Sequence, residues 1–218
     1  MIPRQAHRDL ISTPNSSSMK KQVKALLLSF AVAGLAACSG TQDAVEQTNK
    51  TNERRNESVA AAIETPAQVK ARLDYDADFA VAASSSNQLE VAISKLAQQK
   101  AIALEVKEWA KTIETEHTKM DQELAAIAGR ANITLPQMMS EDDRDHYNDV
   151  DDRKYFGFDK KYLRSLKDAY ERDVQRFAAA ADRLGNAELR AFAAQSLPNL
   201  RAHLQQTEEL YKRADERK

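Results

Sequence analysis

Residues that suit a helix core recur every three or four positions in four separate segments of this 218-residue chain. Such spacing places them on one face of an α-helix, so each segment is predicted to be helical. Glycine and proline contribute only five residues each and aromatic residues only 6%, too few for the many turns and strands of a sandwich or barrel. The fold class is therefore all-α. The four stripes consist of Phe79, Ala83, Ser86, Glu90, Ile93 and Ala97; of Val106, Trp109, Ala110, Ile113, His117, Met120, Leu124 and Ile127; of Tyr162, Leu166, Tyr170, Val174, Phe177 and Leu184; and of Leu189, Phe192, Ser196, Leu200, His203, Thr207 and Leu210.

The first two stripes belong to different helices, although no Gly, Pro or Asn separates them. Glu90 and His117 are 27 positions apart. At about 100° per residue, that separation would put the two stripes on opposite sides of one continuous helix. The chain is therefore predicted to reverse near residues 101–104.

The remaining helix ends follow from turn residues. Gly129 is a suitable residue just past the end of the second helix, and a crossover of almost thirty residues then leads to a third helix beginning near Phe158. Gly185-Asn186 separates the third helix from the fourth, in which Pro198 predicts a kink or a restart with Ser196 as N-cap. Two helical hairpins joined by a long crossover form a four-helix bundle with ferritin-like connectivity.

The first forty residues resemble a bacterial export signal. Lys20, Lys21 and Lys24 precede an apolar stretch, residues 25–34, that is too short to span a bilayer. Leu35-Ala36-Ala37-Cys38 then resembles the lipobox of bacterial lipoproteins, which implies cleavage before Cys38 and acylation of that residue, for example with palmitate. Residues 1–37 are thus expected to be a signal peptide, with Met19 as the natural start. The alternative is ordinary secretory cleavage with a chance cysteine.

The protein is expected to be located in the cell envelope. Ser39 rather than Asp after the cysteine implies, by analogy with lipoprotein sorting, a lipid anchor in the outer membrane and a domain facing the periplasm. Without residues 1–37 the chain has 27 basic and 32 acidic residues, and this net charge of −5 argues against nucleic acid or an anionic lipid surface as the target. A single cysteine excludes an internal disulfide and a cysteine-rich zinc site.

Polar composition and helical spacing divide the rest of the chain. Residues 38–73 have no sustained apolar face and are predicted to be the lipidated cysteine and a flexible tether, with a root-mean-square span of about 30 to 35 Å. Residues 74–213 form the predicted bundle and 214–218 a tail. The acidic part of the crossover, residues 141–152, lacks the glycine of an EF-hand and is predicted to be a solvated loop.

Four ionisable residues, one per predicted helix, lie on or beside the apolar stripes: Glu90, His117, Asp159 and His203. Glu114 and His117 also make a Glu-x-x-His step, a spacing that helical carboxylate-bridged metal sites use, but Leu200 replaces the glutamate of a second step before His203. Three interpretations remain open: a buried hydrogen-bonded network that fixes helix register, a site for iron, zinc or manganese, or side chains that face water.

Several segments have a characteristic order and spacing: Phe79-Ala80-Val81-Ala82-Ala83 with Gln88-Leu89-Glu90, Lys95-Leu96-Ala97, Glu116-His117-Thr118-Lys119, Leu135-Pro136, Phe158-Asp159-Lys160-Lys161-Tyr162 and Leu197-Pro198-Asn199-Leu200-Arg201-Ala202-His203-Leu204. Together they resemble the bacterial family catalogued as domain of unknown function 4142. The resemblance covers about residues 75–211 and implies a ferritin-like fold in a secreted or lipid-anchored protein, whose biochemical activity is not established. The family pattern has a histidine in the third helix where this chain has Tyr170, which is either a further metal-ligand candidate or a core aromatic with a bonded hydroxyl.

No motif supports hydrolytic or nucleotide chemistry, because the chain has no glycine-rich phosphate loop and no Gly-x-Ser-x-Gly turn. The leading interpretation is a non-catalytic, lipid-anchored periplasmic helical bundle that acts through its surface on envelope proteins, in envelope maintenance or stress tolerance. The alternative is a ferritin-like metal-binding or redox protein that uses the inward Glu, His and Asp residues.

Overall fold

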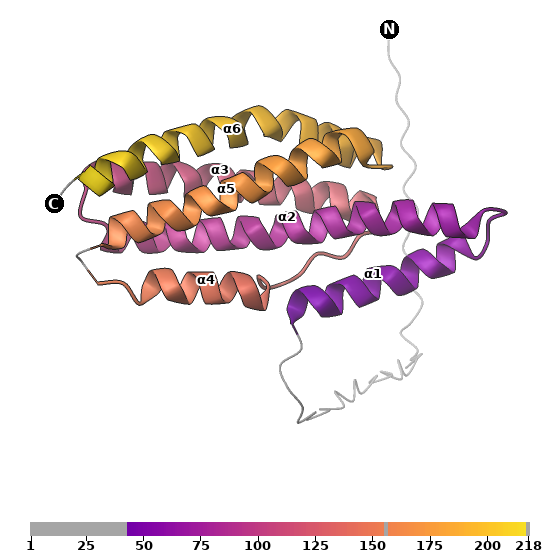
Figure 1. Cartoon of the computed structure of the whole chain (residues 1–218). Coiled ribbons are helices and arrows are strands. Elements are labelled where there is room, and N and C mark those ends of the chain that lie inside the picture. The colour runs from indigo at the N-terminus through magenta and orange to yellow at the C-terminus, as the bar shows by residue number, and fades with distance from the viewer. Residues whose placement is uncertain (1–42, 155–156, 217–218) are drawn as a thin grey trace, which may run out of the picture. The chain divides into compact units, whose positions relative to one another are not determined.

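The computed structural model describes residues 43–154 and 157–216, and within them the chain forms six helices and no strands (Figure 1). This result confirms the all-α fold class. The predicted signal peptide and Cys38 lie outside the described residues. The helices are α1 (Ala44–Ala60), α2 (Pro66–Lys100), α3 (Leu104–Arg130), α4 (Glu141–Asp151), α5 (Phe158–Arg183) and α6 (Ala187–Glu216).

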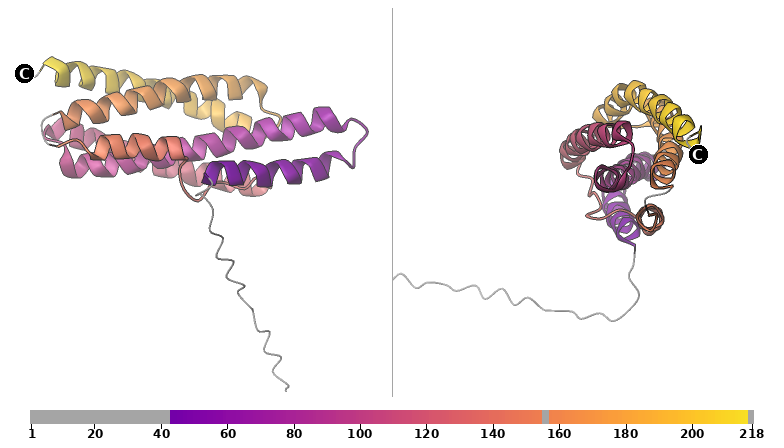
Figure 2. Two further views of the ribbon diagram at one scale, coloured as in Figure 1. Left: turned by 60° about the horizontal axis from the view of Figure 1, so that its bottom comes forward. Right: turned by 90° about the vertical axis from the view of Figure 1, so that its left-hand side faces the viewer.

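The long helices α2, α3, α5 and α6 pack around a shared apolar core (Figure 2). Helix α2 packs along α3 and helix α5 along α6, while α2 also contacts α5 and α3 contacts α6. Leu89, Ile113 and Leu166 are among the core side chains that have no exposed surface. The four predicted stripes therefore do face one core.

The chain reverses between α2 and α3 at the predicted position. Helix α2 ends at Lys100, where the N–H of Ala101 still donates to the carbonyl of Ala97, and α3 begins at Leu104. The Asp159 carboxylate accepts hydrogen bonds of 2.9 Å from the N–H groups of Ile102 and Ala103. Asp159 thus ties the start of α5 to this turn, which fixes one hairpin against the other.

The end of α3 differs from the prediction. Gly129 lies inside the helix, and the residue with the left-handed conformation is Asn132, with φ of 57°. The N–H of Ile133 donates to the carbonyl of Ala128 at 2.8 Å, which is the long hydrogen bond of a Schellman motif. Asparagine tolerates this conformation better than most residues, so it takes the place predicted for glycine.

Residues 44–60 form helix α1, where the sequence predicts a flexible tether. The Asp43 side chain caps the helix by accepting from the N–H of Val45 at 2.7 Å, and it also accepts from the N–H of Glu141 at 2.7 Å. The buried face of α1 consists of Thr48, Asn52 and Asn56 with Ala60. Since this face is mostly polar, an analysis of apolar spacing does not detect it.

The acidic crossover is likewise helical rather than a loop. Ser140 caps α4 by accepting from the N–H of Asp143 at 3.1 Å. Glu141, Asp142 and Asp143 lie in the first turn, where negative charge is favourable to the helix dipole. Helix α4 packs on α2 and α5 through Val150, its one fully buried side chain.

Helix α6 is continuous through Pro198, so the predicted restart with Ser196 as N-cap does not occur. Asn186 caps the helix instead, since its Oδ1 accepts from the N–H groups of Glu188 and Leu189. The helix also extends into the predicted tail, to Glu216. No helix in the described part of the chain has the length and apolar character that crossing a bilayer requires.

Candidate functional site

A cluster of ionisable side chains is buried where the four long helices meet. Its members are all 6% exposed or less. We call this set the buried polar cluster; it consists of Glu90 from α2, His117 from α3, Tyr170 and Asp173 from α5, and His203 from α6. Buried charges are costly unless paired, so the contacts inside the cluster decide its chemistry.

His117 lies at the centre of the cluster and both its nitrogens have partners. Its Nδ1 is 2.9 Å from Asn87 Oδ1 and 2.7 Å from Glu90 Oε2, and its Nε2 is 3.0 Å from the Tyr170 hydroxyl. Burial lowers the pKa of His117 to about 4. The imidazole is therefore neutral at pH 7, with one nitrogen donating and the other accepting.

Glu90 and Asp173 form a pair of buried carboxyl groups. Burial raises the pKa of Glu90 to about 8, and a hydrogen bond with Asp173 offsets part of that rise. Burial and the charge of Glu90 raise the pKa of Asp173 to about 7. Ser86 Oγ donates to Asp173 Oδ2 at 2.9 Å, and Arg176 forms an ion pair with the same carboxylate. Near neutral pH the pair therefore carries less negative charge than two ionised carboxylates.

His203 connects the buried polar cluster with the surface. Its ring centroid lies 5.6 Å from that of His117 and 5.4 Å from that of Tyr170, on the cluster side. On the other side its Nε2 is 2.7 Å from Oε2 of Glu116, a half-exposed residue. Burial lowers the pKa of His203, as does the neighbouring His117. Nδ1 of His203 is buried without a hydrogen-bond partner among the described residues.

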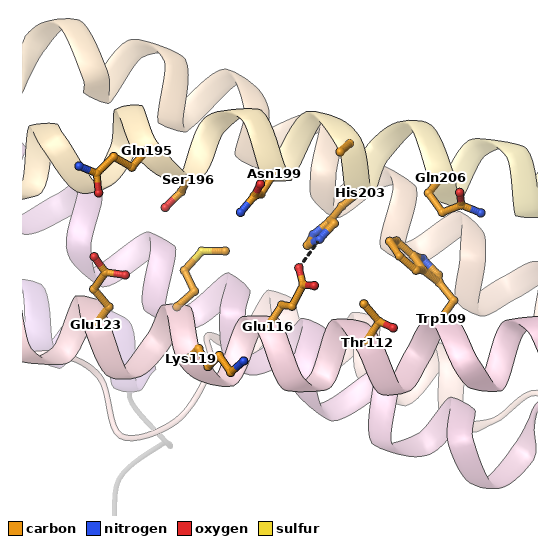
Figure 3. Close-up of a pocket in the computed structure, with 12 residues that line it drawn as sticks. Trp109, Thr112, Glu116, Lys119, Glu123, Gln195, Ser196, Asn199, His203 and Gln206 are labelled. Atoms are coloured by element: carbon orange, nitrogen blue, oxygen red, sulfur yellow. Dashed lines mark hydrogen bonds and ion pairs between the residues drawn. The ribbon is translucent and has the colours of Figure 1, made fainter.

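A groove of about 760 Å³ opens between α3 and α6 beside His203 (Figure 3). Figure 3 shows side chains of both helices extending toward each other across it, with the Glu116–His203 contact in the middle. Trp109 lines one end, and its indole N–H donates to Thr207 Oγ1 at 3.1 Å. The lining residues, which define the α3–α6 groove, are Trp109, Thr112, Glu116, Lys119, Met120, Glu123, Gln195, Ser196, Asn199, Ala202, His203 and Gln206.

The structure brings together only some of the predicted metal-ligand candidates. Glu90, His117, Tyr170 and His203 share the buried polar cluster, with the Tyr170 hydroxyl bonded to His117 as the core-aromatic interpretation predicts. Glu114 and Asp159 lie outside the cluster, as described next.

Glu114 accepts a hydrogen bond of 2.6 Å from Gln98, and Asp159 caps the α2–α3 turn, so neither carboxylate is directed at the imidazoles. Across residues 43–154 and 157–216, no group of three or more His, Cys, Asp or Glu side chains is arranged to hold a metal ion.

Two residues of the site, Asp173 and Glu116, are not among the candidates predicted from the sequence. Asp173 follows Tyr170 by three positions and Leu166 by seven, so its helical spacing could have placed it on the inward face of α5. Glu116 gave no such signal, because it lies beside the inward stripe of α3 and reaches His203 only across the interface with α6.

A comparison with known families matches residues 58–210 to the family described as Domain of unknown function (DUF4142). The chain belongs to this family. The DUF4142 match begins inside α1 and ends near the end of α6, so it includes the buried polar cluster and the α3–α6 groove. No curated protein and no solved structure matches the chain.

Proposed function

We propose that this DUF4142 protein is a lipid-anchored, non-catalytic binding module of the bacterial envelope, with the α3–α6 groove as its binding surface. One observation carries the binding role. Polar side chains from both helices line the groove, yet most of them make no hydrogen bond or ion pair within the described residues. Donors and acceptors that are free in this way are available to a ligand. They are Lys119, Glu123, Gln195, Ser196, Asn199 and Gln206.

The proposed architecture is a ferritin-like four-helix bundle. Its support is the connectivity: the α2–α3 hairpin and the α5–α6 hairpin are joined by a long crossover that contains α4. The buried polar cluster occupies the position where bundles of this kind carry inward polar side chains. In this chain His117 bonds to Tyr170 and Asn87, and Asp173 bonds to Ser86, so we assign the cluster to helix register rather than to catalysis.

The proposed anchor is the acylated Cys38 in the outer membrane, with the domain facing the periplasm and serving envelope maintenance or stress tolerance. The lipobox-like Leu35-Ala36-Ala37-Cys38 supports this assignment. Five residues lead from Cys38 to Asp43, the N-cap of α1, and fully extended they span at most about 18 Å. An acylated Cys38 would therefore hold α1 close to the lipid, in place of the longer tether that the sequence predicts.

Cys38→Ser tests the anchor. We expect the variant to lose labelling by a radioactive or clickable palmitate and to move from the membrane to the soluble periplasmic fraction, with unchanged helix content. Ser39→Ala, next to the acylation site, is the control and should remain membrane-bound. If Cys38→Ser still sediments with outer membranes, a protein partner rather than a lipid attaches the domain.

A photo-crosslinking residue tests the groove. Placed at Asn199, inside the α3–α6 groove, it should give adducts in intact cells, because a bound ligand or partner would lie within reach. Placed at Gln205, an exposed position of the same helix outside the groove, it should give few. Equal adduct yields at the two positions would argue against a specific role for the groove.

A further inference from the structure

We propose that the α3–α6 groove binds a neutral oligosaccharide, a short chain of sugars recognised through their hydroxyl and amide groups. This inference rests on the proposed binding role of the groove but not on the lipid anchor. The shape, hydrogen-bonding capacity, charge and aromatic content of the groove each bear on the class of ligand.

The groove is elongated. On α3 its lining runs from Trp109 to Glu123, and on α6 from Gln195 to Gln206. At 1.5 Å rise per residue these stretches are about 21 Å and about 16 Å long. The volume of about 760 Å³ lies within the usual range for a ligand site. A linear ligand of several units fits these dimensions better than a single small molecule.

Three of the six free polar side chains in the groove are carboxamides. Gln195, Asn199 and Gln206 follow one another along α6 at spacings of four and seven, so they face the groove as a row. Each carboxamide has both donors and an acceptor, and the Ser196 hydroxyl has both as well. A chain of sugars carries many hydroxyl groups, each able to donate and to accept a hydrogen bond, so it can pair with all of these side chains.

The charges in the groove favour a neutral ligand. Glu116 and Glu123 oppose an anionic chain, and Lys119 opposes a cationic one. Burial and the neighbouring His117 lower the pKa of His203, which disfavours a positive charge on this imidazole. The lining therefore has no dominant charge of either sign to attract a polyanion or a polycation.

Trp109 supplies a flat apolar surface at one end. Its ring is held by the Thr207 hydrogen bond and by an edge-on contact with His203, with ring centroids 5.4 Å apart. A rigid, partly exposed indole can cover the apolar C–H face of a sugar ring. Met120 is the only large aliphatic side chain in the lining, so an amphipathic helix would find few apolar contacts there.

Trp109 is the only tryptophan in the chain, so its fluorescence reports directly on the groove. The full chain is purified in a zwitterionic detergent, since sugar-headed detergents would compete. We expect chitotetraose, a neutral tetramer of N-acetylglucosamine, to change the Trp109 emission in a saturable way. The fully deacetylated, cationic tetramer, an anionic tetragalacturonate and a neutral polar tetrapeptide should each bind at least tenfold more weakly.

Adjacent substitutions on α6 provide the matched control. Gln206→Ala and Asn199→Ala should each weaken chitotetraose binding by roughly 2- to 10-fold, the effect of losing one or two neutral hydrogen bonds. Gln205→Ala, one position away and outside the groove, should leave the affinity unchanged. Circular dichroism on each variant verifies that the helices are intact.

Three results would overturn the inference: no saturable response to chitotetraose, an equal or stronger response to a charged tetramer or the peptide, or equal effects of Gln206→Ala and Gln205→Ala. If sugars fail to bind while Asn199 still crosslinks specifically in cells, only the ligand class is wrong. If crosslinking is equal at Asn199 and Gln205 and sugars also fail to bind, the proposed binding role of the groove is wrong as well.

Discussion

At the residue scale, the core of this protein carries acid and imidazole groups where most cores carry only apolar side chains. His117 bonds to Tyr170 and Asn87, Asp173 bonds to Ser86, and Glu90 lies against His117 with Oε2 2.7 Å from Nδ1. Each of these contacts joins two different helices. A one-turn slip of any helix would leave a buried polar group unpaired, so the cluster favours a single register.

The buried carboxyl pair predicts that stability falls with rising pH between pH 6.5 and 8. The folded chain keeps the Glu90 proton up to about pH 8, whereas the ordinary value is 4.5. The folded state thus binds more protons than the unfolded state, and the free energy of unfolding decreases as pH rises through this window. Asp173, with a pKa raised to about 7, acts in the same direction. Below pH 6.5 His117 has the opposite effect on stability. Its imidazole is protonated in the unfolded chain but stays neutral in the folded chain down to about pH 4, so the free energy of unfolding decreases as the pH falls.

Glu90→Gln should flatten the decrease between pH 6.5 and 8 by up to about 1.4 kcal/mol per pH unit, the value for one proton. Urea unfolding at pH 6.5, 7 and 8 measures this slope. Gln205→Ala, an exposed substitution that removes no titratable group, should keep the wild-type slope. A wild-type slope in Glu90→Gln would mean that Glu90 is ionised in the folded protein.

Two tyrosine substitutions separate a buried hydroxyl from an exposed one. Tyr170→Phe leaves Nε2 of the fully buried His117 without a partner, which should cost about 1–3 kcal/mol of unfolding free energy. Tyr211→Phe removes a hydroxyl that accepts from Arg164 at the surface and should cost less than about 0.5 kcal/mol. Both values come from urea titrations at pH 7. Equal costs would show that the Tyr170–His117 bond contributes nothing beyond a surface contact.

At the element scale, apolar spacing predicts the helices that bury apolar faces and misses those that do not. The reversal before Leu104 and the start of α5 at Phe158 follow from the stripes and their phase. Helix α1 buries Thr48, Asn52 and Asn56, which recur every fourth position but are polar. Its stability comes from hydrogen bonds to other parts of the chain, and these contacts have no signature in local hydrophobicity.

Apolar spacing likewise predicts only part of the candidate site. Glu90, His117 and His203 could be predicted because they interrupt apolar stripes. The α3–α6 groove could not, because it depends on how far apart two helices lie, and that distance is set by side chains on both. Glu114 was predicted from a sequence spacing alone, and in the structure it pairs with Gln98 instead.

Asn52 should be the main attachment of α1. Its side chain donates to the carbonyl of Thr134 and accepts from the N–H of Thr134, both at 2.9 Å, and it is 2% exposed. Asn52→Ala leaves two backbone groups of Thr134 without these partners, so α1 should open more readily, by about 1–3 kcal/mol. Hydrogen exchange of the α1 amides measures this change. Thr51→Ala, on the exposed face of the same helix, should leave exchange nearly unchanged, and equal acceleration in both variants would contradict the assignment.

At the scale of the whole described domain, α2 packs against four of the other five helices. It contacts α1, α3, α4 and α5, whereas α1 packs on α2. More than half of the buried residues of α2 are apolar, and they include Phe79, Leu89 and Ile93, whereas the buried face of α1 is polar apart from Ala60. Apolar burial contributes most of the cooperative stability of a fold, so α1 should unfold as a separate, weaker unit and the four long helices as one.

Leu89→Ala tests this division. Leu89 has no exposed surface and belongs to the common core, so the truncation should lower the free energy of global unfolding by about 2–5 kcal/mol. In native-state hydrogen exchange, the slowest amides of α2, α3, α5 and α6 should all accelerate together, because they exchange through the same global opening. Amides of α1 exchange through its own local opening and should change far less. Leu104→Ala, whose side chain is 69% exposed, is the control and should alter neither set. If Leu89→Ala accelerates α1 as much as the long helices, then α1 belongs to the same cooperative unit and its polar contacts are as strong as the apolar core.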